Sequence, residues 1–218
     1  MDSLLTAVRT NNLAGVRDLL RRGMEVNTTD PNGTSLLMIA AWEGHVQMVD
    51  FLLAQGARVQ RRNNVRETAL MYAALKGHLD IVKKLQARGA EINQDGWTAL
   101  HYCAAEGRLQ VCQYLLEQKA DIDAASPNGT TPLMMAARQG HFDVVKLLLW
   151  EHADPQRKSE SGQTALGMAL RGGFEQAAQL IAADEIDILI DMHGLSAGTR
   201  PGIFGLRPAP IQATWPTR

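Results

Sequence analysis

The sequence predicts an all-α solenoid of about six stacked helix-turn-helix units with projecting turns. A short phrase of residues returns along the chain, and its copies keep a spacing of about 33 residues. Within each copy the apolar residues recur at helical spacing, and most of the helical runs end at a glycine. A repeat of this length is typical of architectures in which each unit buries its apolar face against its neighbours.

The repeated phrase occurs in five copies. The fullest two begin at Asn32 and Asn128 and end in a pair of alanines, and shorter copies begin at Thr68, Thr98 and Thr164. One leucine marks the register of the copies. It stands at equal intervals, apart from a shorter second interval, at Leu37, Leu70, Leu100, Leu133 and Leu166. Leu4 precedes the first of these by one further full repeat, so a degraded sixth unit opens the chain.

Each copy is predicted to form two short helices. The threonine supplies an oxygen that caps free backbone N–H groups, and Pro132 follows one such threonine at the first helical position, where its missing N–H costs nothing. A glycine further on permits the positive φ that turns the chain into the second helix. These turn glycines include Gly77, Gly107 and Gly140. The apolar stripe of one second helix consists of Val46, Val49, Leu52 and Leu53.

These residues resemble the ankyrin-repeat family, whose signature is a Thr-Pro-Leu-His helix start, a Gly-His turn and a Gly-Ala-Asp-x-Asn segment. Gly-His stands at 44–45, 77–78 and 140–141, and Gly-Ala at 56–57 and 89–90. The likeness covers roughly residues 2 to 187 and implies a stack with an N-terminal capping unit. We therefore predict a repeat domain over residues 1–189, with a cap at about 2–29 and units at 30–62, 63–95, 96–125, 126–158 and 159–189.

Two departures from the family pattern carry structural predictions. Lys119 and His152 replace the glycine that ends a second helix, which costs about 1 kcal/mol each if they adopt positive φ, so these units should fray first. The third projecting turn is also truncated. It has three residue steps, from Asn93 to Gly96, where the first turn has six, from Asn27 to Gly33. We expect the binding edge to be notched there.

Composition excludes several classes of partner. The 22 Lys+Arg nearly balance the 23 Asp+Glu, so the overall field that would attract nucleic acid is missing. No apolar run approaches the ~18 residues of a membrane span, and the N-terminus lacks the apolar core of a secretory signal. We expect a cytoplasmic protein, with nuclear entry open, that inserts into no membrane and is a monomer.

The residues that could carry metal or redox chemistry have structural interpretations. His45, His78 and His141 occupy the same position in different repeats, about 8–10 Å or more apart, and cannot share a zinc ion. Cys103 and Cys112 lie in apolar helical stretches, where we interpret them as core fillers in a reducing compartment. The sequence therefore predicts no metal and no cofactor.

One catalytic pattern occurs at 194–198, where Ser196 lies between glycines after an apolar run at 186–192, as a hydrolase nucleophile elbow follows its strand. No Asp, Glu or His follows Ser196, and Pro201 stands where the helix of that motif should run, so we predict no enzyme activity. Four of the eight prolines lie close together near the C-terminal end, at 201, 208, 210 and 216. We expect residues 190–218 to be a Pro/Gly-rich, flexible tail, with a short docking segment around Trp215 as the alternative.

In the ankyrin family the concave surface consists of the projecting turns and the two residues before the turn glycine of each first helix. Carried over by position, the resemblance implies partner-binding residues at Trp42, Glu43, Leu75, Lys76, Trp97, Glu106, Arg138, Gln139 and Arg171. Further turn positions are Arg61, Arg62, Arg66 and Thr130. Tryptophan and arginine are enriched in interface hot spots. The alternative is that Trp42 and Trp97 lie flat against their own repeats and shield the core.

The function favoured by this pattern is a protein-protein interaction module, acting as adaptor, scaffold or inhibitor. Two alternatives stay open at this stage: an enzyme or the regulatory subunit of one, and the targeting part of a longer chain. The scaffold itself does not identify the partner, because recognition lies in side chains that vary between members of a fold.

Overall fold

The computed structural model describes residues 2–192, with side chains over 3–184. This part of the chain consists of helices joined by loops, without a strand. The inner helices are α1 (Asp2–Arg9), α3 (Leu36–Glu43), α5 (Ala69–Lys76), α7 (Ala99–Ala105), α9 (Pro132–Gln139) and α11 (Ala165–Gly172). The outer helices are α2 (Leu13–Arg21), α4 (Val46–Ala54), α6 (Leu79–Ala87), α8 (Leu109–Glu117), α10 (Phe142–Trp150) and α12 (Glu175–Met192).

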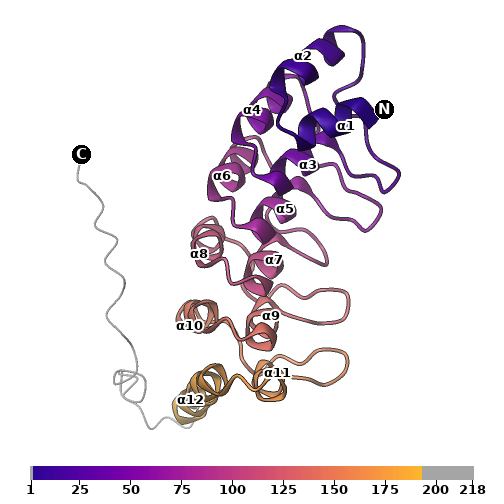
Figure 1. The fold of residues 1–218 in the computed structure, drawn as a ribbon. Helices are drawn as coiled ribbons and strands as arrows, with labels where there is room; N and C mark the ends of the chain where they lie inside the picture. The colour runs from indigo at the N-terminus through magenta and orange to yellow at the C-terminus, as the bar shows by residue number, and fades with distance from the viewer. Residues whose placement is uncertain (1, 193–218) are drawn as a thin grey trace, which may run out of the picture.

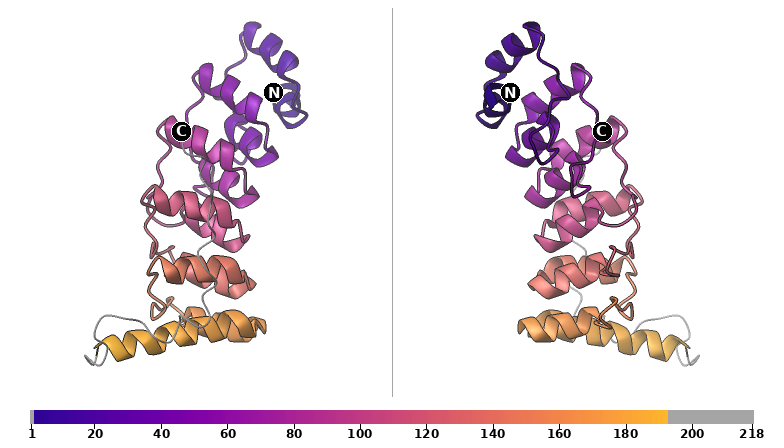
Figure 2. Two further views of the ribbon diagram at one scale, coloured as in Figure 1. Left: turned by 90° about the vertical axis from the view of Figure 1, so that its left-hand side faces the viewer. Right: turned by 90° about the vertical axis from the view of Figure 1, so that its right-hand side faces the viewer.

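The helix pairs stack in chain order into one solenoid, which confirms the predicted fold class. Inner helices form one column and outer helices a second, and the loops that enter α3, α5, α7, α9 and α11 project on the far side of the inner column (Figure 1). Side views show the pairs following one another along a single stack (Figure 2). We call the surface formed by these loops and the C-terminal ends of the inner helices the inner face.

Capping residues begin the inner helices as the repeated phrase predicts. Thr68, Thr131 and Thr164 each accept a hydrogen bond of 3.2–3.3 Å from the N–H three residues later. In α3 the cap is Ser35, which follows the threonine of the phrase. The turn glycines that end these helices have positive φ, for example 81° at Gly77. Local chemistry thus fixes where each inner helix starts and stops.

The core runs without interruption through the stack. Alanine pairs of the inner helices, such as Ala73–Ala74, are fully buried and permit close approach of neighbouring inner helices. Leucine and valine from the outer helices, such as Leu52 and Leu85, fill the space between the two columns. Each pair thereby buries its apolar face against the next pair, as a solenoid requires.

Both non-glycine helix ends adopt the strained conformation expected from the sequence. Lys119 has φ 67° and His152 has φ 69°, in the left-handed region that favours glycine. The α6–α7 loop, which holds residues 93–96, projects less than its neighbours (Figure 1), as its shorter sequence predicts. Elsewhere the loop tips bond to each other: Asn64 N–H donates to the Asn32 carbonyl, and Glu160 N–H to the Asn128 carbonyl, both at 3.0 Å.

The two cysteines differ from the sequence interpretation. Cys103 of α7 and Cys112 of α8 are fully buried, but they form a disulfide, with Cα atoms 5.7 Å apart. Their burial agrees with the interpretation as core fillers, whereas the disulfide was not expected from the sequence. The nine-residue separation spans the turn between the two helices of one unit, so both side chains face the same interior and meet.

The C-terminal part of the described region is helical throughout. Residues 186–192, considered above as a strand leading into a nucleophile elbow, form the end of α12. The pattern around Ser196 and the Pro-rich stretch predicted as a tail lie outside the described residues, except for 190–192. The division at 189/190 therefore stays a prediction. Across the described helices, none has the length and apolar character needed to cross a membrane.

Candidate interaction surface

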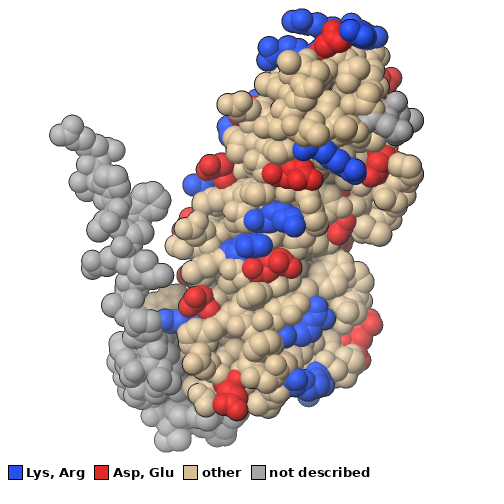
Figure 3. Space-filling view, viewed as in Figure 1, with Lys and Arg blue, Asp and Glu red and all other residues tan. Residues whose placement is uncertain are grey.

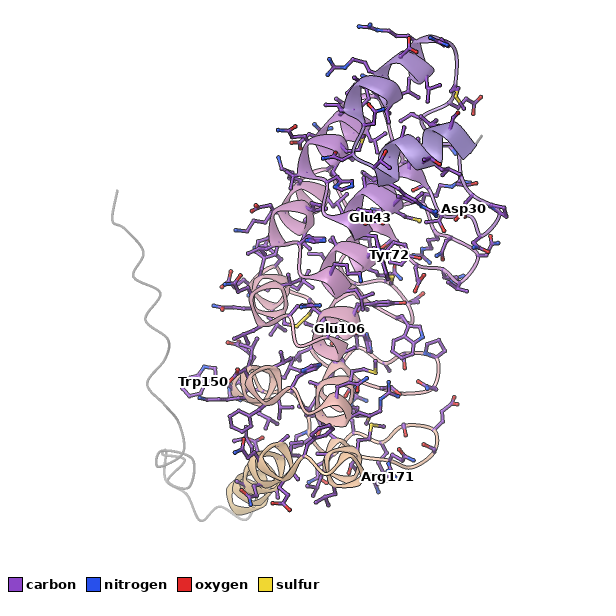
Figure 4. All side chains as sticks on the ribbon, viewed as in Figure 1. Asp30, Glu43, Tyr72, Glu106, Trp150 and Arg171 are labelled. Carbon is purple, nitrogen blue, oxygen red and sulfur yellow. A yellow bond between two sulfur atoms is a disulfide. The ribbon has the colours of Figure 1, made fainter. Side chains whose placement is uncertain are left out.

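The candidate residues lie on the inner face, eight at the C-terminal ends of inner helices and Trp97 in the α6–α7 loop. Figure 4 shows Glu43, Glu106 and Arg171 following one another along the inner column. Seven candidates are exposed: Trp42, Glu43, Lys76, Glu106, Arg138, Gln139 and Arg171. Leu75 and Trp97 are half-buried. Thr130 does not line this surface, because its side chain is 5% exposed and packs inward.

Charges alternate along these helix ends. Glu43, Lys76 and Glu106 follow in successive pairs, and Figure 3 shows acidic and basic side chains alternating down this side of the molecule. Glu106 lies 3.8 Å from the Arg108 guanidinium. Within the described part of the chain, Arg138 and Arg171 have no ion pair. The inner face therefore presents positive charge without an ion pair at the ends of α9 and α11.

Trp42 packs onto the next unit rather than flat against its own. Its ring meets Tyr72 edge-on, with centroids 5.2 Å apart, and the Lys76 ammonium lies 4.0 Å from the Trp42 centroid. The side chain stays 38% exposed. Trp97 packs edge-on against residues of its own unit, His101 at 5.2 Å and Tyr102 at 6.5 Å. The two tryptophans thus occupy different environments.

Between the two tryptophans lies a polar cluster that the sequence interpretation missed. Both oxygens of the Glu67 carboxylate accept hydrogen bonds, Oε2 from Tyr72 Oη (2.7 Å) and Asn63 Nδ2 (2.8 Å), and Oε1 from Tyr102 Oη (2.8 Å). We call Asn63, Glu67, Tyr72 and Tyr102 the Glu67 cluster. Burial, reinforced by the Glu67 hydrogen bonds and charge, raises the pKa of both tyrosines well above the usual range. Both hydroxyls therefore stay protonated donors.

A sequence signal for this cluster existed. Tyr72 and Tyr102 occupy the same position of two successive copies, each following Leu70 or Leu100 by two residues. In other copies that position holds Ile39, Met135 or Met168. Two neighbouring tyrosines where apolar residues otherwise stand indicate a surface with polar partners. Together with Trp42 and Trp97 they form an aromatic row, defined as Trp42, Tyr72, Tyr102 and Trp97, across three units.

Side chains of the following unit hold the candidate helix ends in place. His78 Nε2 lies 3.2 Å from the Trp42 carbonyl oxygen, and Arg108 Nε donates to the Leu75 carbonyl at 3.0 Å. The same pattern joins His45 to the Arg9 carbonyl and His141 to the Ala105 carbonyl. These contacts satisfy carbonyls at helix ends, which have no partner inside the helix. The turn histidines thus position the surface.

The histidine, cysteine and acidic side chains of the described residues form no metal-binding group of three or more. His101, the helix-start histidine, is fully buried, and its Nε2 donates to the Thr130 carbonyl at 2.9 Å. Burial lowers the pKa of His101 to about 4. The imidazole therefore acts as a neutral structural link between units.

Comparison with known proteins agrees with this architecture. A family model described as ankyrin repeats in three copies matches residues 4–95, 60–126, 84–159 and 121–192, which together cover most of the chain. Ankyrin repeat domain-containing protein 29 of Homo sapiens is 44% identical over 54 residues, which is 24% of this chain and 18% of that protein.

Two further similar proteins share only short stretches with the chain. UDP-N-acetylglucosamine–peptide N-acetylglucosaminyltransferase of Caenorhabditis elegans is 58% identical over 40 residues, or 18% of this chain and 4% of that protein. The probable transferase of this kind, SPINDLY, of Eustoma exaltatum subsp. russellianum is 44% identical over 41 residues, or 19% and 4%. The chain spans less than a fifth of the length of each of these three relatives. On the family match and the stacked helix pairs together, the chain belongs to the ankyrin-repeat family.

Proposed function

We propose that the protein is an adaptor, scaffold or inhibitor that binds a protein partner through its inner face. Ankyrin repeats indicate a protein-interaction module, and the family is generally non-catalytic. The proposed binding residues are the nine candidates of the inner face, extended by Tyr72 and Tyr102. The partner is a protein, and the near balance of charge argues against nucleic acid.

The observation that carries the proposal is the aromatic row. Its four side chains are partly exposed and form a band across three units, from Trp42 at 38% exposure to the half-buried Trp97. Tryptophan, tyrosine and arginine dominate interface hot spots because they bury large areas at low entropic cost. Arg138 and Arg171, which lack an ion pair in the described range, extend the band toward the C-terminal end.

The alternating charges support a partner that binds the stack in one defined register. Glu43, Lys76 and Glu106 lie on successive units, so a partner segment laid along the stack meets opposite signs at repeat spacing. Charges at the rim of an interface act mainly on association rate and on discrimination between partners. A partner with the complementary order of charges is therefore favoured over one with a uniform charge.

The proposal includes a monomer in the cytoplasm, with nuclear entry open. The buried disulfide does not conflict with a reducing compartment, because both sulfurs are fully buried and thiol reductants reach them only when α7 and α8 separate. An enzymatic role has less support, since the similarity to the two transferases covers 4% of each. If the protein is instead the targeting part of a longer chain, the same inner face would bind the partner.

A capture experiment tests the proposal. Immobilised intact protein and a Trp42→Ala/Arg138→Ala variant are exposed to the same cell extract, after circular dichroism has confirmed that both are folded. We expect a partner captured by the intact protein to be lost from the variant, because truncating hot-spot residues costs about 2 kcal/mol or more each.

A matched control places comparable changes, one aromatic residue and one arginine to alanine, on the outer helices. Phe142 of α10 is 37% exposed, almost the exposure of Trp42, and Arg88 at the end of α6 is also exposed. The Phe142→Ala/Arg88→Ala variant should capture the same partner as the intact protein. Equal capture by all three proteins would contradict the inner face as the binding surface.

A further inference from the structure

The Glu67 carboxylate carries a negative charge that its own structure does not neutralise. Its three hydrogen-bond donors are two hydroxyls and one amide, which are neutral groups. A carboxylate has about four acceptor positions on its two oxygens, and Oε1 receives a single donor, Tyr102. One acceptor position on Oε1 is therefore left for a further donor.

Two basic side chains, Lys76 and Arg62, have other partners. The Lys76 ammonium lies over the Trp42 ring at 4.0 Å, and Arg62 pairs with Glu91 at 3.5 Å. In the described part of the chain, no lysine or arginine forms an ion pair with Glu67. The charge of Asp30 also acts on Tyr72 and adds to the negative field. The site therefore favours a cation from outside.

The truncated α6–α7 loop lies beside Tyr102. Residues 93–96 cover in three residue steps the part of the loop for which residues 27–33 take six. This short loop also ends at Trp97, whose ring lies 6.5 Å from that of Tyr102. Both rings are half-buried and so keep part of their surface accessible.

A half-buried carboxylate bordered by aromatic rings matches the chemistry of an alkyl-ammonium or guanidinium group. The rings attract a cation over their faces, and the carboxylate accepts its hydrogen bond. We infer that the Glu67 cluster, together with Trp97, is the anchor site for one basic side chain, arginine ahead of lysine, in a peptide segment of the partner protein. This inference rests on the proposed function and specifies the partner chemistry at one point of the inner face.

Arginine fits better than lysine for geometric reasons. Its planar guanidinium stacks on an aromatic ring while its N–H groups donate in the ring plane, and it loses less hydration than an ammonium. An acidic segment is repelled by Glu67 and by the exposed Glu43 and Glu106 on the adjacent units. An uncharged segment leaves the negative charge of Glu67 without a countercharge in a site that excludes part of the solvent.

Capped heptapeptide pools with degenerate flanks and a fixed central residue, Arg, Lys, Gln or Glu, provide the test. Their affinities are measured by fluorescence anisotropy for intact protein, for Glu67→Gln and for Glu151→Gln. The amide that Glu67→Gln introduces keeps an acceptor oxygen for a tyrosine, so the substitution removes the charge with little change in shape. Glu151→Gln removes the same charge from an exposed position after α10, on the outer column.

We expect the intact protein to bind Arg-centred pools about tenfold more tightly than Gln-centred pools, the effect of one charge-assisted hydrogen bond. Glu67→Gln should abolish this preference, and Glu151→Gln should keep it. Equal affinity for all pools, no detectable binding of any pool, or an arginine preference that survives in Glu67→Gln would each overturn the inference.

The Trp42→Ala/Arg138→Ala variant separates this inference from the proposed function. If that variant weakens binding of all pools while none shows a basic preference, the inner face binds peptides and the inference alone is wrong. If the arginine preference depends on Glu67 but capture from extract does not depend on Trp42 and Arg138, the anchor site is right and the wider surface is wrong.

Discussion

The imidazole Nε2 of His101 lies 2.9 Å from the carbonyl oxygen of Thr130, so one side chain joins the fourth helix pair to the loop that enters the fifth. Its Nδ1 lies 2.9 Å from Thr98 Oγ1 and accepts the Thr98 N–H at 3.2 Å. A carbonyl oxygen can only accept, so the proton resides on Nε2. The contact therefore requires the neutral imidazole.

Acid should destabilise the protein through His101. Because burial lowers its folded pKa to about 4, below the value of about 6.5 in an unfolded chain, the unfolded state binds the proton first. The stabilisation is complete above pH 6.5 and is lost as the pH falls through 4, by roughly 3 kcal/mol. Urea unfolding at pH values between 7 and 4 measures this loss in the free energy of unfolding. A His101→Asn variant should show a shallower decline, and an equal decline would contradict this role.

Lys119→Gly should stabilise the protein by up to about 1 kcal/mol, because Lys119 has φ 67° and glycine adopts this conformation without a Cβ penalty. The matched control adds a Cβ to the glycine at the equivalent position of another unit. Gly89 has φ 84° and open space around a built Cβ, so Gly89→Ala should destabilise by a similar amount through backbone strain alone. Urea midpoints of the two variants should move in opposite directions. A shift in the same direction would show that packing, not φ, governs these helix ends.

Alkylation in denaturant should find no free thiol without reductant and two thiols after reduction, because Cys103 and Cys112 form a disulfide. Reduction should also lower the free energy of unfolding by about 2–3 kcal/mol, the entropy released when a loop of this size opens. A Cys103→Ala/Cys112→Ala variant should unfold at the same urea concentration with and without reductant. Two alkylated thiols in the untreated protein would refute the bond.

Tyr102→Phe should cost about 1 kcal/mol, because it removes a hydrogen bond to a carboxylate and leaves Glu67 Oε1 without its donor. Tyr114 of α8 supplies the control, since its hydroxyl donates at 3.1 Å to the neutral amide oxygen of Gln86. Tyr114→Phe should cost less than Tyr102→Phe in urea unfolding. In a Glu67→Gln background the cost of Tyr102→Phe should shrink, and an unchanged cost would show that the two groups are not coupled.

The parts of the fold that sequence analysis predicted correctly are governed by short-range chemistry. The cap at Thr68, the turn at Gly77 and the positive φ of Lys119 each depend on residues within one turn of helix. The period of the repeat then places successive units on one another. Because these rules are local, a single sequence was enough to apply them.

The parts that were missed join residues from different units or different helices. Glu67 and Tyr102 are 35 positions apart, and their contact depends on how far one unit rotates against the next. Cys103 and Cys112 meet across a turn whose geometry decides whether the sulfurs face each other. Thr130 was placed on the surface by position, yet its loop backbone turns toward His101 of the preceding unit. The candidate residues themselves are located by the fold, and their role in binding stays a prediction.

The shortened α6–α7 loop divides the projecting loops into two hydrogen-bonded sets. Asn64 bonds to Asn32 in one set and Glu160 to Asn128 in the other, and among the described residues no backbone bond of this kind joins the loop tips across the gap. Bending the stack at α7 therefore breaks no bond between loop tips, whereas bending within either set breaks one. We therefore expect the stack to bend more readily at α7 than within either set, and a partner that lies across α7 would restrain the angle between the two sets.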